Sequence, residues 1–152
     1  MALTSEEWAR IHKGVLDSVR AALDGLDDET LGWSVPGTEM SIAREAAHIC
    51  NSERSWLLRA GFPSDVPELA KDCGAQDILQ GLDSVESAYA SLLRERPDDL
   101  DMLYGLARVC LHAIYHQGRI ACFRIRQDPK WNYPKGASIH DAMDLIIDAM
   151  LR

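Results

Sequence analysis

The stretch that decides the fold runs from residue 98 to residue 127 and reads DDLDMLYGLARVCLHAIYHQGRIACFRIRQ. Apolar residues recur in it at the three- and four-residue spacing of an α-helix, and they occupy nearly every side of that helix. A helix of this kind must be covered on most sides, either by neighbouring helices of a bundle or by a second subunit. The spacing therefore predicts a long helix that ends before Pro129.

The rest of the chain carries the same helical period in shorter segments. The period predicts helices over four further ranges: 5–26, 42–60, 75–96 and a short one from Ser138 onward. Thr4 and Glu7 have the spacing of a capping box, which marks the start of the first helix. Neither the alternation of a half-buried strand nor a hairpin turn is present. We therefore predict an all-α fold, a four-helix bundle with a short extra C-terminal helix.

Length and composition limit the kind of protein. A chain of 152 residues with 47% hydrophobic and 26% charged residues has the size and composition of one globular domain, which we place over residues 1–152. A net charge of −8 disfavours nucleic acid and anionic lipid as partners. No apolar run approaches the roughly 18 residues that span a bilayer, and the acidic start lacks the pattern of a signal peptide. We therefore expect a cytoplasmic protein.

The four cysteines do not form a recognisable metal or redox motif. Cys50, Cys110 and Cys122 lie within helical patterns, Cys73 lies in a predicted loop, and no Cys-x-x-Cys pair is present. We expect free thiols in a reducing compartment.

The sharpest chemical signal is a pair of histidines one helical turn apart, His112 and His116. Two imidazoles at this spacing can direct their nitrogens at one metal ion. The spacing alone leaves three interpretations open: a metal site, a solvated pair, or two core histidines with hydrogen-bond partners. A third ligand must come from another helix, and His48 is the best candidate because it lies in the middle of one. For His12 and His140 we expect ordinary surface or capping roles.

Three further residues are candidates for lining such a site. Ser52 lies one turn from His48, and Arg119 lies one turn from the histidine pair. Glu53 stands on an apolar arc of its helix, where a carboxylate costs free energy unless it is paired. We expect it to brace the bundle by bonding Gln117 or an arginine, with a base that reaches toward the metal cleft as the alternative.

Two stretches resemble the signatures of a known family. Residues 32–57, GWSVPGTEMSIAREAAHICNSERSWL, resemble the first signature of the DinB-like proteins, damage-inducible four-helix bundles that include the bacillithiol S-transferases. Residues 112–120, HAIYHQGRI, are similar to the second signature, a His-x-x-x-His followed closely by glycine. The resemblance covers residues 5 to 127 and does not extend to the tail after Pro129.

The resemblance implies an up-down-down-up bundle, a homodimer, and a divalent metal, zinc or nickel, on His48, His112 and His116. A metal on three imidazoles can acidify bound water or bind an incoming thiol, so these ligands do not separate thiol S-transfer from hydrolysis. We therefore predict a metal-dependent enzyme acting on a small molecule, with a low-molecular-weight thiol among the candidate substrates. The alternative is a non-catalytic dimeric module that binds a ligand or partner and holds a structural or vestigial metal.

Overall fold

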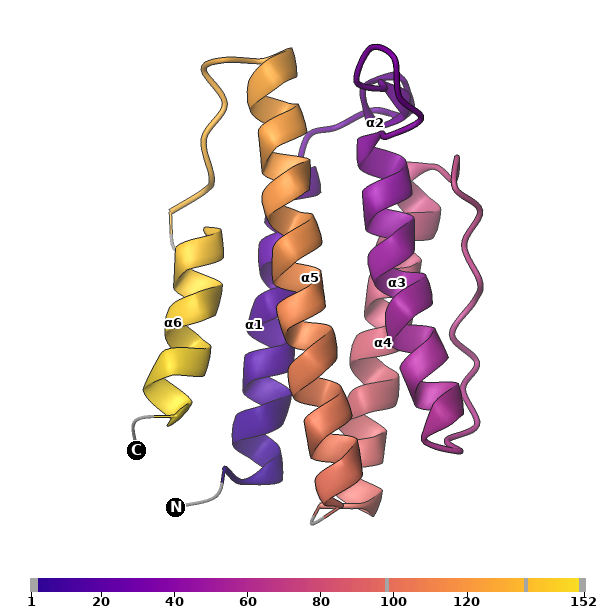
Figure 1. Cartoon of the computed structure of the whole chain (residues 1–152), viewed down its shortest axis with the longest axis vertical. Helices are drawn as coiled ribbons and strands as arrows, with labels where there is room; N and C mark the ends of the chain where they lie inside the picture. The colour runs from indigo at the N-terminus through magenta and orange to yellow at the C-terminus, as the bar shows by residue number, and fades with distance from the viewer. Residues whose placement is uncertain (1–2, 98, 136, 151–152) are drawn as a thin grey trace.

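A computed structural model describes residues 3–97, 99–135 and 137–150, and this part of the chain is all-α. Its helices are α1 (Ser5–Leu23), α2 (Asp28–Gly32), α3 (Ile42–Arg59), α4 (Ala75–Glu95), α5 (Leu100–Gln127) and α6 (Ile139–Met150). The four long helices α1, α3, α4 and α5 pack together, and the short α6 lies along α1 (Figure 1). The predicted fold class and the extra C-terminal helix are confirmed.

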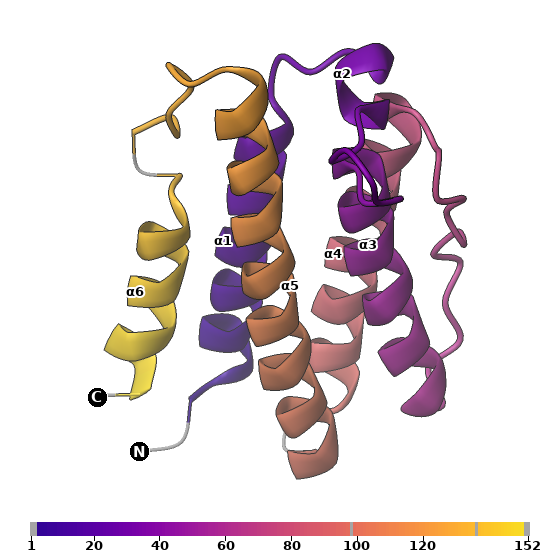
Figure 2. The ribbon, with the colours of Figure 1, turned by 45° about the horizontal axis from the view of Figure 1, so that its top comes forward.

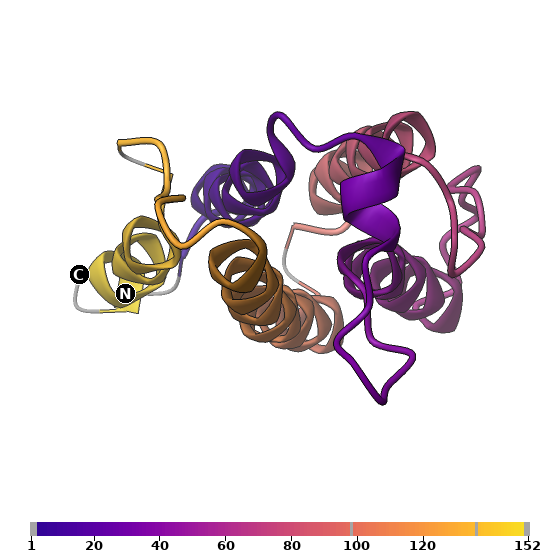
Figure 3. The same cartoon turned by 90° about the horizontal axis from the view of Figure 1, so that it is seen from above.

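The four long helices follow the up-down-down-up order. In Figure 1, α1 and α5 run upward, whereas α3 and α4 run downward. Because α3 and α4 are parallel, the chain between them must return along the whole bundle, and residues 60–74 do so on its outer side (Figure 2). Seen from above, the long helices stand at four corners, with α5 between α1 and α3 (Figure 3). The helices α3 and α5 are thereby neighbours that pack against each other.

Side-chain caps begin the helices close to the predicted positions. Thr4 and Glu7 form the predicted capping box at the start of α1. Ser41 caps α3 and Asp99 caps α5, each by accepting a hydrogen bond from the backbone N–H three residues ahead. The expected first residue of the long helix, Asp98, lies outside the described residues.

The first helix is shorter than the periodicity predicts. It ends at Leu23 instead of Leu26 because Gly25 adopts a φ of 72°, a left-handed conformation that ends a helix. The chain then forms the short α2, which the apolar period does not predict. Asp27 caps α2 by accepting a hydrogen bond from the backbone N–H of Thr30.

The core lies between the four long helices and covers only one side of α5. Many large side chains are fully buried there, among them Ile11, Leu16, Ile42, Ile49, Leu57, Ile78, Leu82, Leu92, Leu106 and Ile120. On the opposite side of α5, Tyr104, Leu111 and Tyr115 are 65%, 60% and 61% exposed. Within the single chain, bundle neighbours therefore cover α5 on one side only, and cover of the other side by a second subunit stays a prediction. Bundle neighbours cover the α5 side that carries Leu106 and Ile120.

Two further observations bear on the sequence predictions. Across residues 3–97, 99–135 and 137–150, no helix is both long enough and apolar enough to cross a membrane. The four cysteines are free thiols: Cys50 and Cys110 are buried, Cys73 is partly buried, and Cys122 is exposed.

Candidate metal centre

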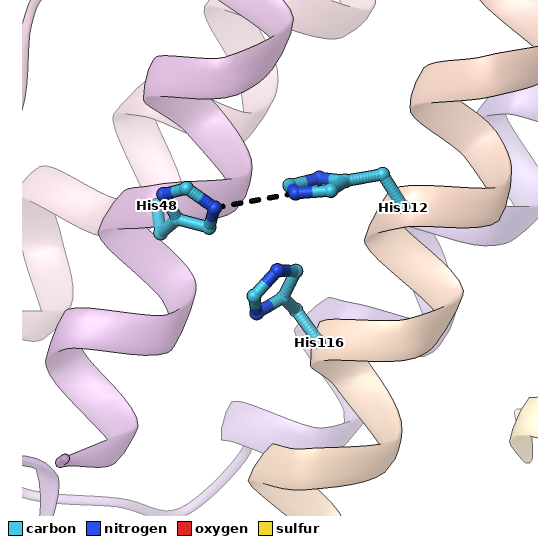
Figure 4. Close-up of side chains that lie close together, drawn as sticks. All are labelled: His48, His112 and His116. Atoms are coloured by element: carbon cyan, nitrogen blue, oxygen red, sulfur yellow. Dashed lines mark hydrogen bonds between the residues drawn. The ribbon is translucent and has the colours of Figure 1, made fainter.

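Three histidines from two helices meet in the groove between α3 and α5. His48 projects from α3, and His112 and His116 project toward it from successive turns of α5 (Figure 4). One ligand nitrogen from each ring lies within 4.8 Å of the other two. The Nε2 atoms of His48 and His112 are 3.2 Å apart. The structure thus brings together the three residues that the sequence selected.

These separations fit a divalent ion bound by imidazoles. Zinc–nitrogen bonds of about 2.0–2.1 Å in a tetrahedral arrangement place two ligand nitrogens about 3.3 Å apart. The His48–His112 distance already matches this value. The centroids of the three rings lie 4.4–5.0 Å apart, so all three rings are close enough to share one ion.

The surroundings of His48 and His112 favour the neutral form of the imidazole, which is the form that metals bind. Burial lowers the pKa of His48, and the neighbouring His116 adds a smaller effect in the same direction. Burial, reinforced by the neighbouring imidazoles, lowers the pKa of His112 to about 4. Two of the three rings therefore carry free lone pairs at neutral pH, and no proton has to leave them before a cation binds.

A buried carboxylate orients the third ring. Glu45 is almost fully buried, and its Oε2 lies 2.5 Å from Nδ1 of His116. The ring N–H at Nδ1 donates to this carboxylate, which leaves Nε2 of His116 as the ligand atom. Arg119 contacts the other carboxylate oxygen, with Nη2 3.1 Å from Oε1. The predicted lining residue Arg119 thus reaches the site through Glu45.

Glu45 was not among the predicted site residues, although the sequence holds a signal for it. It lies three residues before His48, one turn away on the same helix, so both side chains face α5. An acidic residue among apolar neighbours on that face is a marker of a paired charge. Of the other predicted residues, Ser52 is partly buried one turn beyond His48, and His140 is exposed on α6.

Glu53 lies apart from the histidine cluster, in the centre of the bundle. Its fully buried Oε2 is 2.6 Å from Nε2 of His12, on the diagonally opposite helix α1. The predicted surface or capping role of His12 is therefore wrong: the residue is buried, and its ring packs against Tyr89. The partner of Glu53 is thus His12 and not the expected Gln117, whose side-chain amide donates a hydrogen bond to the hydroxyl of Tyr133.

A cavity adjoins the histidine cluster and provides room for a ligand. It has a volume of about 300 Å³ and is bordered by His48 and His116. Met40, Arg44 and Lys71 form other parts of its wall. Three imidazole ligands would leave at least one coordination position of a metal for water or substrate, and the cavity lies beside two of these histidines.

Comparison with known proteins identifies a family. A family model described as the DinB superfamily matches residues 12–120 of the chain. The matched range contains all three histidines of the cluster and Glu45, and it ends before the tail that follows Pro129. No curated protein and no solved structure gives a significant match.

Proposed function

The chain belongs to the DinB superfamily, and on that basis we propose that it is a metal-dependent enzyme acting on a small molecule. The observation that carries the proposal is the convergence of His48, His112 and His116, whose ligand nitrogens lie within 4.8 Å of one another. Imidazole donors suit zinc and nickel, so we propose one of these ions as the cofactor.

The residues around the cluster support nucleophile activation. A divalent ion bound there would lower the pKa of a coordinated water or thiol toward neutrality. Glu45 holds the proton on Nδ1 of His116 and so keeps Nε2 available as a ligand. Arg119 stabilises the ionised carboxylate inside the bundle. The adjoining cavity admits the substrate, and the two proposed reactions are S-transfer from a low-molecular-weight thiol and hydrolysis.

Elemental analysis tests the metal site. Untagged protein purified without chelators is expected to carry about one zinc or nickel ion per chain, and His116→Ala is expected to lose it. His140→Ala is the matched control, because His140 is exposed on α6 and outside the cluster. Unchanged metal content in His116→Ala would contradict the proposal. Metal-dependent consumption of a small thiol in the presence of an alkyl halide would then identify S-transfer.

A second candidate function is a non-catalytic dimeric module with a structural metal. The exposed apolar side of α5 favours it, because Tyr104, Leu111 and Tyr115 form a stripe that a second copy of the chain can cover. Under this candidate, chelation lowers the melting temperature and no turnover is found with metal present. Unchanged melting with loss of turnover favours the enzyme. A sedimentation mass of 16.9 kDa at micromolar concentration would contradict the dimer.

A further inference from the structure

Two positive side chains line the cavity although the chain as a whole is acidic. The chain has 16 basic and 24 acidic residues, for a net charge of −8. Arg44 and Lys71 nevertheless line the cavity beside the histidines. One carboxylate, Glu45, also lines it, and Arg119 pairs with that carboxylate from outside the cavity. A positive opening on a negatively charged molecule directs anions to that opening.

Arg44 retains hydrogen-bond donors for a ligand. Its Nη1 donates to Oε2 of Glu39 at 2.7 Å and to the backbone carbonyl of Glu39 at 3.3 Å. Its Nε and Nη2 donate to no other residue in the described part of the chain. One edge of the guanidinium thus remains available for the two parallel hydrogen bonds that arginine forms with a carboxylate. Because Glu39 is 85% exposed, this ion pair orients Arg44 without strongly neutralising it.

Lys71 approaches the same cavity from a different segment. It lies on the connection between α3 and α4, which Asn51 fastens to α3 by hydrogen bonds to both the carbonyl and the N–H of Leu69. Within the residues that the structure describes, the Lys71 ammonium forms no ion pair. Two cations from two separate segments therefore border one cavity. The carboxylate that lies near both of them, Glu39, is 85% exposed, so solvent screens its charge.

We propose that this cavity binds the carboxylate of a small organic acid next to the metal-binding histidines. Arg44 is its bidentate partner and Lys71 is the second cation, while Met40 and Ala47 contact the apolar part of the molecule. A volume of about 300 Å³ is at the low end for ligand pockets, which restricts the acid to a small one. That this acid is the substrate of an enzyme rests on the proposed function; the inference adds that the substrate is an anion.

The test compares two probes with the same apolar chain, hexanoate and 1-hexanol, by NMR titration of metal-free and zinc-loaded protein. We expect hexanoate to bind at least tenfold more tightly than hexanol, and Arg44→Met to remove most of this difference. Arg54→Met is the matched control. Arg54 lies on the same helix, its side chain is 29% exposed like that of Arg44, and it too pairs with an exposed glutamate. Lys71→Met is a second variant, placed outside the helices.

The outcomes separate this inference from the metal proposal. Hexanoate binding that weakens in Arg44→Met and Lys71→Met but not in Arg54→Met supports the inference, even in metal-free protein. Equal binding of the two probes would overturn it. Binding of hexanoate that requires zinc and is unchanged in both cavity variants would also overturn it, because the ion alone would then hold the carboxylate. Failure of the protein to load zinc refutes only the metal proposal, since the metal-free titration still decides this one.

Discussion

The Nδ1 atom of His116 lies 2.5 Å from Oε2 of Glu45, and both side chains are buried in the groove between α3 and α5. The carboxylate comes from the same helix as His48, so one turn of α3 supplies both a proposed metal ligand and the group that orients the proposed ligand His116 on α5. Arg119 balances the charge of Glu45. Without such a partner a buried carboxylate would be strongly unfavourable.

Replacing Glu45 is therefore expected to weaken metal binding without removing a ligand. Glu45→Gln keeps the size of the side chain but loses the charge that holds the proton on Nδ1 of His116. Loss of such a partner typically costs 10- to 100-fold in metal affinity. Competition with a chromophoric chelator measures the affinity, and Glu68→Gln, an exposed carboxylate on the α3–α4 connection, is the control. Equal affinities of Glu45→Gln and the parent protein would contradict the role given to Glu45.

The lowered pKa of His112 predicts a specific pH dependence of the metal-free protein. The folded-state pKa is about 4 and the ordinary value is 6.5, so between these values the unfolded chain binds a proton that the folded chain does not. The free energy of unfolding is thus expected to fall as the pH drops from 6.5 toward 4. The lowered pKa of His48 acts in the same direction. Burial is the main cause of both shifts.

Urea titrations at several pH values test this dependence against the variant His112→Gln. Carboxylates titrate in the same range, so the informative quantity is the difference between the parent and variant curves. The variant is expected to lose less stability than the parent between pH 6.5 and pH 4.5. Parallel curves would show that His112 does not contribute.

The sequence predicts those features that depend on local spacing. The apolar period places α3, α4 and α5 within a few residues of their observed bounds, and the capping box places the start of α1. The four-residue spacing of His112 and His116 requires only that their segment be helical. The resemblance to the DinB-like signatures then selects His48 as the third histidine, and the antiparallel packing of α3 against α5 brings it to the pair.

The spacing of apolar residues does not predict which helices face each other, nor the contacts that depend on this. Glu45 and His116 are 71 residues apart, and His12 and Glu53 are 41 residues apart. The period shows that Glu53 lies on an apolar arc, but it does not show which side chain stands opposite in the bundle. It likewise cannot distinguish a helix side covered by bundle neighbours from one that is exposed, as Leu111 on α5 is.

The buried pair of His12 and Glu53 is expected to matter for stability and not for metal binding. Its atoms are 2.6 Å apart between two diagonal helices, and Glu53 is fully buried. Removing one partner of a buried pair leaves a polar or charged group without compensation, which costs about 3–5 kcal/mol. His12→Leu is expected to lower the free energy of unfolding by this amount in urea titrations. The double variant His12→Leu, Glu53→Leu is expected to recover much of the loss.

Metal content distinguishes this pair from the histidine cluster. The alternative role of Glu53, a base that reaches toward the metal site, predicts that Glu53→Gln lowers turnover by more than the loss of folded protein explains. The structure leads us to expect that metal stoichiometry and affinity stay unchanged in His12→Leu under conditions in which the variant is folded. A drop in metal affinity comparable to that of Glu45→Gln would show that the two clusters are coupled.

The four thiols are expected to react at very different rates. Thiolates are the reactive form, and burial raises the pKa of Cys50 to about 12 and the pKa of Cys110 well above its usual range. Burial also raises the pKa of the partly buried Cys73. Cys122 is exposed on α5 and is therefore expected to react first with an aromatic disulfide reagent at pH 8. Cys122→Ser should remove the fast phase, whereas Cys50 and Cys110 should react only when denaturant unfolds the bundle. A fast phase that persists in Cys122→Ser would contradict this order of reactivity. If it also persists when Cys73, the partly buried thiol on the α3–α4 connection, is replaced by serine, the bundle around Cys50 and Cys110 opens more readily than its packing indicates.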